Sequence, residues 1–257
     1  MRSRKTNTLI DLIITAYGPA AWPAVGFALT TAHSDMLYRH TRCMPHLLLY
    51  GPRGSGKSTL LRALAALTGD YHLLHTDGSS NGHVLLTANG LKNNLVVVDG
   101  FDQVNTPSIT SMLGSLYFRH FPVGVKLDEV ITSNWMGSGY AIATNVRPVG
   151  ATLLERCVVV EMSDMQHDRM AFEALHAQLD TLQHAPVDHA DLRSGLRSSG
   201  AVLSTWIADV HEAMDGAPEP NRTGLHMAML MTVLTAYEQD PSKSWVLKAC
   251  NYVNSQR

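Results

Sequence analysis

Residues 51–58, with the sequence GPRGSGKS, have the spacing of a loop that binds phosphate groups, G-x-x-x-x-G-K-[ST]. The glycines allow successive backbone N–H groups to turn toward one phosphate. Lys57 is expected to reach the β- and γ-phosphates of a nucleoside triphosphate, and the Ser58 hydroxyl is expected to bind Mg²⁺. The residues predicted to bind the nucleotide are Gly51, Pro52, Arg53, Gly54, Ser55, Gly56, Lys57, Ser58 and Thr59.

Two carboxylates follow the apolar run at residues 95–98. Asp99 ends this run, which predicts a strand, so its carboxylate is expected beside Ser58, where it can hold Mg²⁺ through water. In many ATPases a glutamate that handles the attacking water comes next, but this chain has Gly100 there. Asp102 could reach the same space. The alternative for Asp102 is a residue that only caps a turn.

An amide and an arginine complete the set of candidate catalytic residues. Asn134 ends the apolar segment VITSN, and a neutral amide at such a place can hold water or the γ-phosphate without adding charge. Arg156 precedes another apolar run and could act as an arginine finger on the nucleotide of a neighbouring subunit. The alternative for Arg156 is a surface salt bridge with an acid such as Glu155.

These residues need a sheet that brings strand ends together. Apolar runs that alternate with helical segments predict a parallel sheet with helices on both faces. The predicted strands are residues 47–50, 71–75, 95–99, 128–133 and 157–161, and residues 135–148, rich in glycine and turn formers, are predicted as a surface loop. The expected division is an N-terminal helical segment at 1–44, a nucleotide-binding core at 45–163 and a C-terminal helical domain at 164–257.

The composition is that of an ordinary globular chain, with 45% hydrophobic and 16% charged residues. A net charge of −2 gives no global reason to expect nucleic acid, so any such contact must come from a local patch. The three cysteines are far apart and suit a reducing cytoplasm, bacterial or host. No apolar run is expected to span a membrane, and no secretory signal is recognised.

The order of these motifs resembles that of AAA+ ATPases. Within that family the likeness is to the superfamily 3 helicases of viruses and to helicase-like ATPases of phages and mobile elements. The resemblance covers roughly residues 20–162 and is carried by the helix at 25–37 and by the segments GPRGSGKST, VVVDGFD, ITSN and LLERCVVVEM. Gly100 departs from the family's usual acidic pair.

The resemblance implies an α/β P-loop fold with a five-stranded parallel sheet and a C-terminal all-helical lid. It further implies ATP and Mg²⁺ as ligands, and a homo-oligomeric ring with the nucleotide between subunits. A second arginine sensor would come from the lid, where Arg193 and Arg197 are the candidates. The segment between the aspartate and asparagine strands often contacts nucleic acid in this family. Here it contains Arg119 and Lys126 among aromatic residues, and the alternative is a helix end packed on the core.

Three functions fit these features. The first is an ATP-driven motor that acts on single- or double-stranded DNA, with other replication proteins as possible partners. The second is an AAA+ switch, such as a helicase loader or transposition regulator, that binds ATP and recruits a partner without unwinding; Gly100 and the modest charge favour it somewhat. The third, a monomeric small-molecule kinase, is disfavoured by the helical tail and by the absence of an arginine-rich lid.

Overall fold

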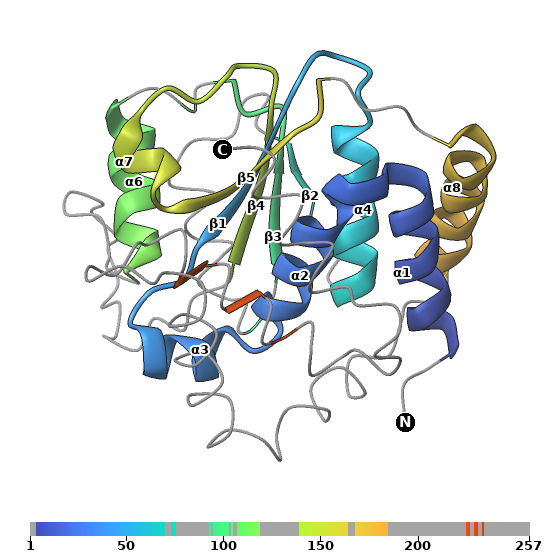
Figure 1. Ribbon diagram of the computed structural model, residues 1–257, viewed down its shortest axis with the longest axis horizontal. Helices are drawn as coiled ribbons and strands as arrows, with labels where there is room; N and C mark the ends of the chain where they lie inside the picture. The colour runs from blue at the N-terminus through green and yellow to red at the C-terminus, as the bar shows by residue number, and fades with distance from the viewer. Residues whose placement is uncertain are drawn as a thin grey trace.

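The computed structural model describes residues 4–69, 73–75, 93, 95–102, 104, 107–118, 139–163 and 168–184, together with helical positions 225, 226, 229, 230 and 233. Helices and strands alternate through most of this part of the chain (Figure 1). In order they are α1 (Arg4–Tyr17), η1 (Gly18–Ala20), α2 (Ala21–Thr31), α3 (Ser34–Thr41), β1 (His46–Tyr50), α4 (Lys57–Thr68), β2 (Leu73–His75), β3 (Leu95–Asp99), α6 (Pro107–Tyr117), β4 (Gly139–Thr144), α7 (Ala151–Leu154), β5 (Cys157–Glu161) and α8 (Arg169–His184).

The strands form one sheet in the order β2-β3-β4-β1-β5, and every described pair is parallel. β1 lies between β4 and the edge strand β5, with Leu48 level with Ile142 of β4 and with Val159 of β5. All five carboxyl ends therefore lie along one edge of the sheet. The α/β class and the parallel sheet flanked by helices, both predicted from the sequence, are confirmed.

Both faces of the sheet are covered, which explains why the strands are apolar runs without alternation. Alternate residues of β1 enter different cores: Leu47 and Leu49 face the helices α1, α2, α4 and α8, whereas Leu48 faces α6 and α7. Figure 1 shows these two groups of helices on opposite sides of the sheet. The sheet is thus the middle layer of three.

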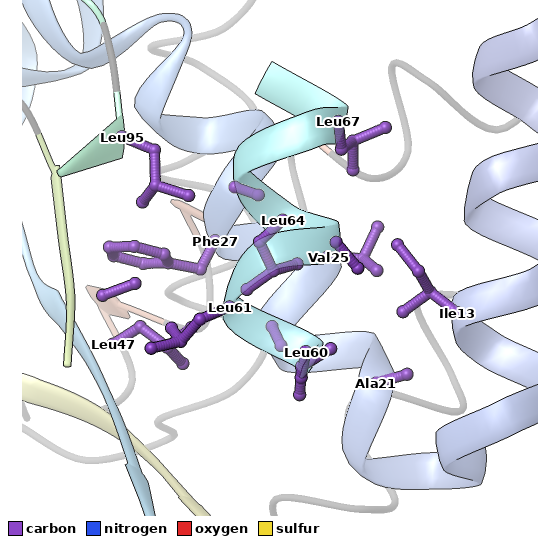
Figure 2. Packing of buried hydrophobic residues seen from close by; sticks show 14 of the residues in the cluster. Ile13, Ala21, Val25, Phe27, Leu47, Leu60, Leu61, Leu64, Leu67 and Leu95 are labelled. Atoms are coloured by element: carbon purple, nitrogen blue, oxygen red, sulfur yellow. The ribbon is translucent and has the colours of Figure 1, made fainter. Parts of the chain in front are cut away.

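The larger core is built around α4, the helix that follows the glycine-rich loop. Leu60, Leu61 and Leu64 of α4 are fully buried and pack with Val25 and Phe27 of α2 (Figure 2). Burying each such side chain stabilises the fold by about 1.5–3 kcal/mol. The N-terminal helices therefore pack into the same core as the helix that carries the candidate phosphate site.

Residues Thr8–Thr31 pass a test of length and mean hydropathy for a membrane-spanning helix, contrary to the sequence prediction that no run would do so. In the structure they form α1, η1 and α2, and 72% of their most apolar 18-residue stretch is buried inside the protein. Their apolar surface is used against α4 and α8, so core packing accounts for it.

The strand between β1 and β3 differs from the prediction. The sequence predicts a strand at 128–133 and a surface loop at 135–148, but β4, Gly139–Thr144, lies within that predicted loop. Residues 128–133 lie outside the described residues. Gly139, Ala141 and Ala143 make β4 look like a weak strand, because glycine and alanine are depleted in strands.

Packing against α2 explains the glycine at position 139. A Cβ added to Gly139 would lie 2.2 Å from Cγ2 of Thr31 and 3.2 Å from Phe27, both on α2. Thr31 cannot easily rotate away, because its hydroxyl donates a 2.7 Å hydrogen bond to the Ala28 carbonyl. The close approach of α2 to β4 therefore requires glycine at position 139.

This contact can be tested with Gly139→Ala. We expect the free energy of unfolding to fall by about 2 kcal/mol, because the added methyl overpacks the core. The melting temperature should fall by about 4–8 °C in differential scanning calorimetry. Gly150→Ala is the matched control: its added Cβ would have its nearest neighbour, Leu153 Cβ, at 3.8 Å, so a change within about 0.5 kcal/mol is expected. Equal effects of the two variants would contradict this account.

Candidate functional site

The glycine-rich loop connects β1 to α4 at the carboxyl edge of the sheet, as the sequence predicts (Figure 1). Gly56 is the N-cap of α4 and has φ +84°, a left-handed conformation that a side chain disfavours. Its carbonyl accepts the first helical hydrogen bond, from Leu60 N–H at 2.9 Å. The free N–H groups of the first turn of α4, together with the helix dipole, make this end of the helix suited to an anion.

Lys57 lies inside the loop. Its Nζ donates hydrogen bonds to the carbonyls of Gly51 and Pro52, at 2.7 and 2.6 Å, and to the hydroxyl of Ser55 at 3.2 Å. Burial lowers the pKa of Lys57, and the carboxylates of Asp99 and Asp102 act in the opposite direction. The ammonium group is thus held at a fixed place close to two acids.

A cavity of about 520 Å³ opens beside this loop. Its walls come from the loop and the start of α4, the ends of β3 and β4, and the first turn of α8. The predicted phosphate-binding residues in its lining are Arg53, Gly54, Gly56, Lys57, Ser58 and Thr59. Three other predicted residues, Gly51, Pro52 and Ser55, instead hold the ammonium group of Lys57.

Two candidate metal ligands lie on this cavity. Asp99, at the end of β3, and Ser58, in the first turn of α4, both line it. Asp99 is only partly buried, and its Oδ1 accepts the N–H of Gly100 at 2.9 Å. A carboxylate and a hydroxyl beside a phosphate site are a donor set that suits Mg²⁺, which keeps most of its waters. These residues fit the predicted metal.

Asn145, which the sequence analysis overlooked, supplies the amide at this site. It directly follows β4, lines the cavity and contacts Asp102. The predicted amide, Asn134, lies outside the described residues, and the strand next to β1 ends at Thr144 rather than at 133. The signal was present, because the segment AIATN at 141–145 resembles VITSN at 130–134. Its small residues made it look like part of a loop.

The turn that follows β3 favours glycine at position 100. Gly100 has φ +72°, a conformation in which a residue with a Cβ is strained by about 1–2 kcal/mol. The turn then continues the sheet, with Phe101 N–H bonded to the Ala143 carbonyl at 2.8 Å. The result is that Asp102, rather than residue 100, lies against the end of β4.

Two aromatic side chains border the site from outside the core motifs. The Tyr17 hydroxyl, at the end of α1, donates a 2.9 Å hydrogen bond to the Gly56 carbonyl. Burial raises the pKa of Tyr17, so the phenol stays protonated and can donate. Phe172 of α8 lines the cavity and lies edge-to-face with Tyr17, with ring centroids 5.7 Å apart. No motif in the sequence marks either residue.

Arg156 lies at the opposite edge of the sheet. Its carbonyl accepts the N–H of His46, the first residue of β1, so it is about 15 Å from the loop at about 3.3 Å per strand residue. The guanidinium packs under α6: it would lie 2.4 Å from a Cβ at Gly114, and it lies 5.6 Å from the Phe118 ring centroid. Within the described part of the chain its Nε has no hydrogen-bond partner.

His46, beside Arg156, is a neutral residue. The ring is fully buried, and burial lowers its pKa to about 4, with the charge of Arg156 acting in the same direction. Its Nε2 therefore carries the proton and donates to the Leu113 carbonyl at 2.9 Å. Of these two neighbouring residues at the amino ends of β1 and β5, Arg156 carries the positive charge and His46 does not.

The other predicted site residues cannot be placed. Arg119 and Lys126, the candidate nucleic-acid contacts, lie outside the described residues. The same holds for Arg193 and Arg197, the candidate lid sensors.

The comparisons with known proteins concern the fold. No family model and no curated protein matches the sequence. Among solved structures, the chain resembles one titled "SCCmec type IV Cch - active helicase", with a TM-score of 0.68 and 12% sequence identity. The match covers 99% of this chain and 50% of that one, so this chain spans about half the length of the solved structure. The fold is therefore helicase-like.

The bond from Tyr17 to the loop can be tested with Tyr17→Phe. Losing it should cost about 1 kcal/mol of unfolding free energy and loosen the loop, so that affinity for inorganic triphosphate falls severalfold in isothermal titration. Tyr38→Phe is the control, because it removes a 2.8 Å bond to the Phe118 carbonyl, at the opposite edge of the sheet. It should cost similar stability and leave triphosphate affinity unchanged. Equal affinity in both variants would show that Tyr17 does not support the loop.

Proposed function

We propose that this protein is an ATP-binding and ATP-hydrolysing AAA+ ATPase, related to superfamily 3 helicases, that works as an oligomeric nucleic-acid motor. One observation carries the proposal: the loop with Lys57, the carboxylate of Asp99 and the amide of Asn145, which Asp102 contacts, border one cavity. A helicase-like fold supports the class of function.

Each group has a role in this proposal. The loop N–H groups and Lys57 bind the β- and γ-phosphates and stabilise charge that builds up on them during transfer. Ser58 and Asp99 would hold Mg²⁺, which neutralises phosphate charge. Asn145 takes the role that the sequence analysis gave to Asn134, holding water or the γ-phosphate without adding a charge.

The proposed site is shared between two copies of the chain. Arg156 lies at the sheet edge away from its own loop, so in this proposal its guanidinium leaves the contacts under α6 and acts on the nucleotide of a neighbouring subunit. There it would act as an arginine finger within a ring, and the C-terminal helices from α8 onward would form the lid.

DNA is the proposed nucleic acid, with Arg119 and Lys126 as proposed contacts and other replication proteins as proposed partners. A phage or mobile element is the proposed source, and the cytoplasm the proposed compartment.

The alternative function is an AAA+ switch that binds ATP and recruits a partner without unwinding. The contact of Asp102 with Asn145 favours the motor over the switch, because it places a carboxylate beside the amide despite Gly100.

An ATPase assay with and without single-stranded DNA, combined with mass measurement in the presence of ATP, tests this function. We expect turnover that DNA stimulates and an ATP-dependent oligomer. Lys57→Ala should lower turnover by about 10²-fold or more, because it removes the cation at the phosphates. ATP-dependent assembly with negligible turnover would instead favour the switch. A monomer that consumes ATP only with a small acceptor would exclude both.

The shared site can be tested by mixing two inactive variants, Lys57→Ala and Arg156→Ala. A mixed ring contains some interfaces in which an intact loop from the Arg156→Ala subunit meets an intact Arg156 from the Lys57→Ala subunit. We expect turnover to recover to about one quarter of the wild-type rate at equal amounts, if each interface acts independently. Turnover that stays at the level of the separate variants would argue against a nucleotide site between subunits.

A further inference from the structure

Asp102 and Asn145 join the ends of β3 and β4. The backbone N–H of Asn145 donates to Asp102 Oδ1 at 2.9 Å. The side-chain Nδ2 of Asn145 lies 3.3 and 3.4 Å from the two carboxylate oxygens of Asp102. One carboxylate thus accepts both the backbone and the side-chain donor of the same residue, which fixes the position and the rotation of the Asn145 side chain.

The charge of Asp102 determines which way the amide faces. The backbone N–H of Asn145 is the main cause that lowers the pKa of Asp102, and Arg53 adds to it, so Asp102 is ionised at neutral pH. An ionised carboxylate only accepts hydrogen bonds. The amide nitrogen of Asn145 must therefore face Asp102, because the flipped amide would place two oxygens against each other.

This orientation leaves Oδ1 of Asn145 as the acceptor that the side chain can offer to the cavity. A phosphate oxygen is itself an acceptor and gains nothing from Oδ1. A water molecule can donate to it. Asn145 lines the cavity together with Lys57 and Asp99, so such a water would lie among the groups that bind the triphosphate.

We propose that Asp102 is a positioning residue: it holds the Asn145 amide so that Oδ1 orients the water that attacks the γ-phosphate. This positioning role rests on the proposed hydrolysis of ATP and gives Asp102 a function in that reaction. The water oxygen bonds to the γ-phosphorus as the bond to the bridging oxygen of ADP breaks. One water proton stays on the inorganic phosphate, and the other is released to solvent.

Asp102 is poorly suited to be the general base. Its oxygens are occupied by the donors of Asn145, and the hydroxyl of Thr144 adds a longer contact at 3.5 Å. The cations near it, Arg53 and Lys57, further favour its ionised form over proton uptake. Its effect on the reaction therefore passes through Asn145.

Two substitutions separate positioning from base catalysis. An asparagine at position 102 can still present a carbonyl oxygen to the N–H groups of Asn145, but it cannot take a proton. We expect Asp102→Asn to keep kcat within about fivefold of the wild type, the cost of replacing a charged acceptor by a neutral one. We expect Asp102→Ala to lower kcat by about 10²-fold, with the affinity for ATP unchanged and the melting temperature lowered by about 2–4 °C, the cost of the lost hydrogen bonds to Asn145.

A double-mutant cycle completes the test. If Asp102 acts through Asn145, Asp102→Ala should change kcat by less than about twofold once Asn145 is alanine. Equal losses in Asp102→Asn and Asp102→Ala, or multiplicative losses in the cycle, would overturn the positioning role while leaving ATP hydrolysis intact. A wild-type protein that binds ATP without hydrolysing it would overturn both the role and the proposed turnover.

Discussion

The parallel direction of the strands is the constraint on which the site depends. Because all strands point the same way, their carboxyl ends meet at one edge, and loops that follow them become neighbours. Lys57, Asp102 and Asn145 are distant in the chain, and the parallel sheet brings them together at this edge. The two hydrophobic cores, one on each face, hold the strands in register and thereby fix the site.

The glycine-rich loop and the class of fold could be predicted from the sequence because their signals are local. The loop needs glycines and lysine at fixed spacing, and buried parallel strands need apolar runs such as LLLY and LVVVD. Both requirements are met within a few consecutive residues. The same holds for the positions of Ser58 and Asp99, which follow directly from those elements.

The remaining parts of the site depend on tertiary packing, which the sequence pattern does not reveal. β4 begins with a glycine because Thr31 and Phe27 of α2 lie against it, and local propensity alone therefore misjudges the strand. Asn145 was missed with that strand. The positive φ of Gly100 explains how Asp102 comes to lie against the end of β4, and this depends on a turn that no motif describes. Tyr17 reaches the loop across 39 residues of sequence.

Tyr17 connects α1 both to the glycine-rich loop and to α8. One side chain at the end of α1 both bonds to the loop and packs against Phe172 at the start of α8, and α1 and α8 lie side by side in Figure 1. Tyr17 therefore links the start of α8 to the carbonyl at the N-terminus of α4 through one ring contact and one hydrogen bond, so α1, α4 and α8 meet at a single side chain beside the glycine-rich loop.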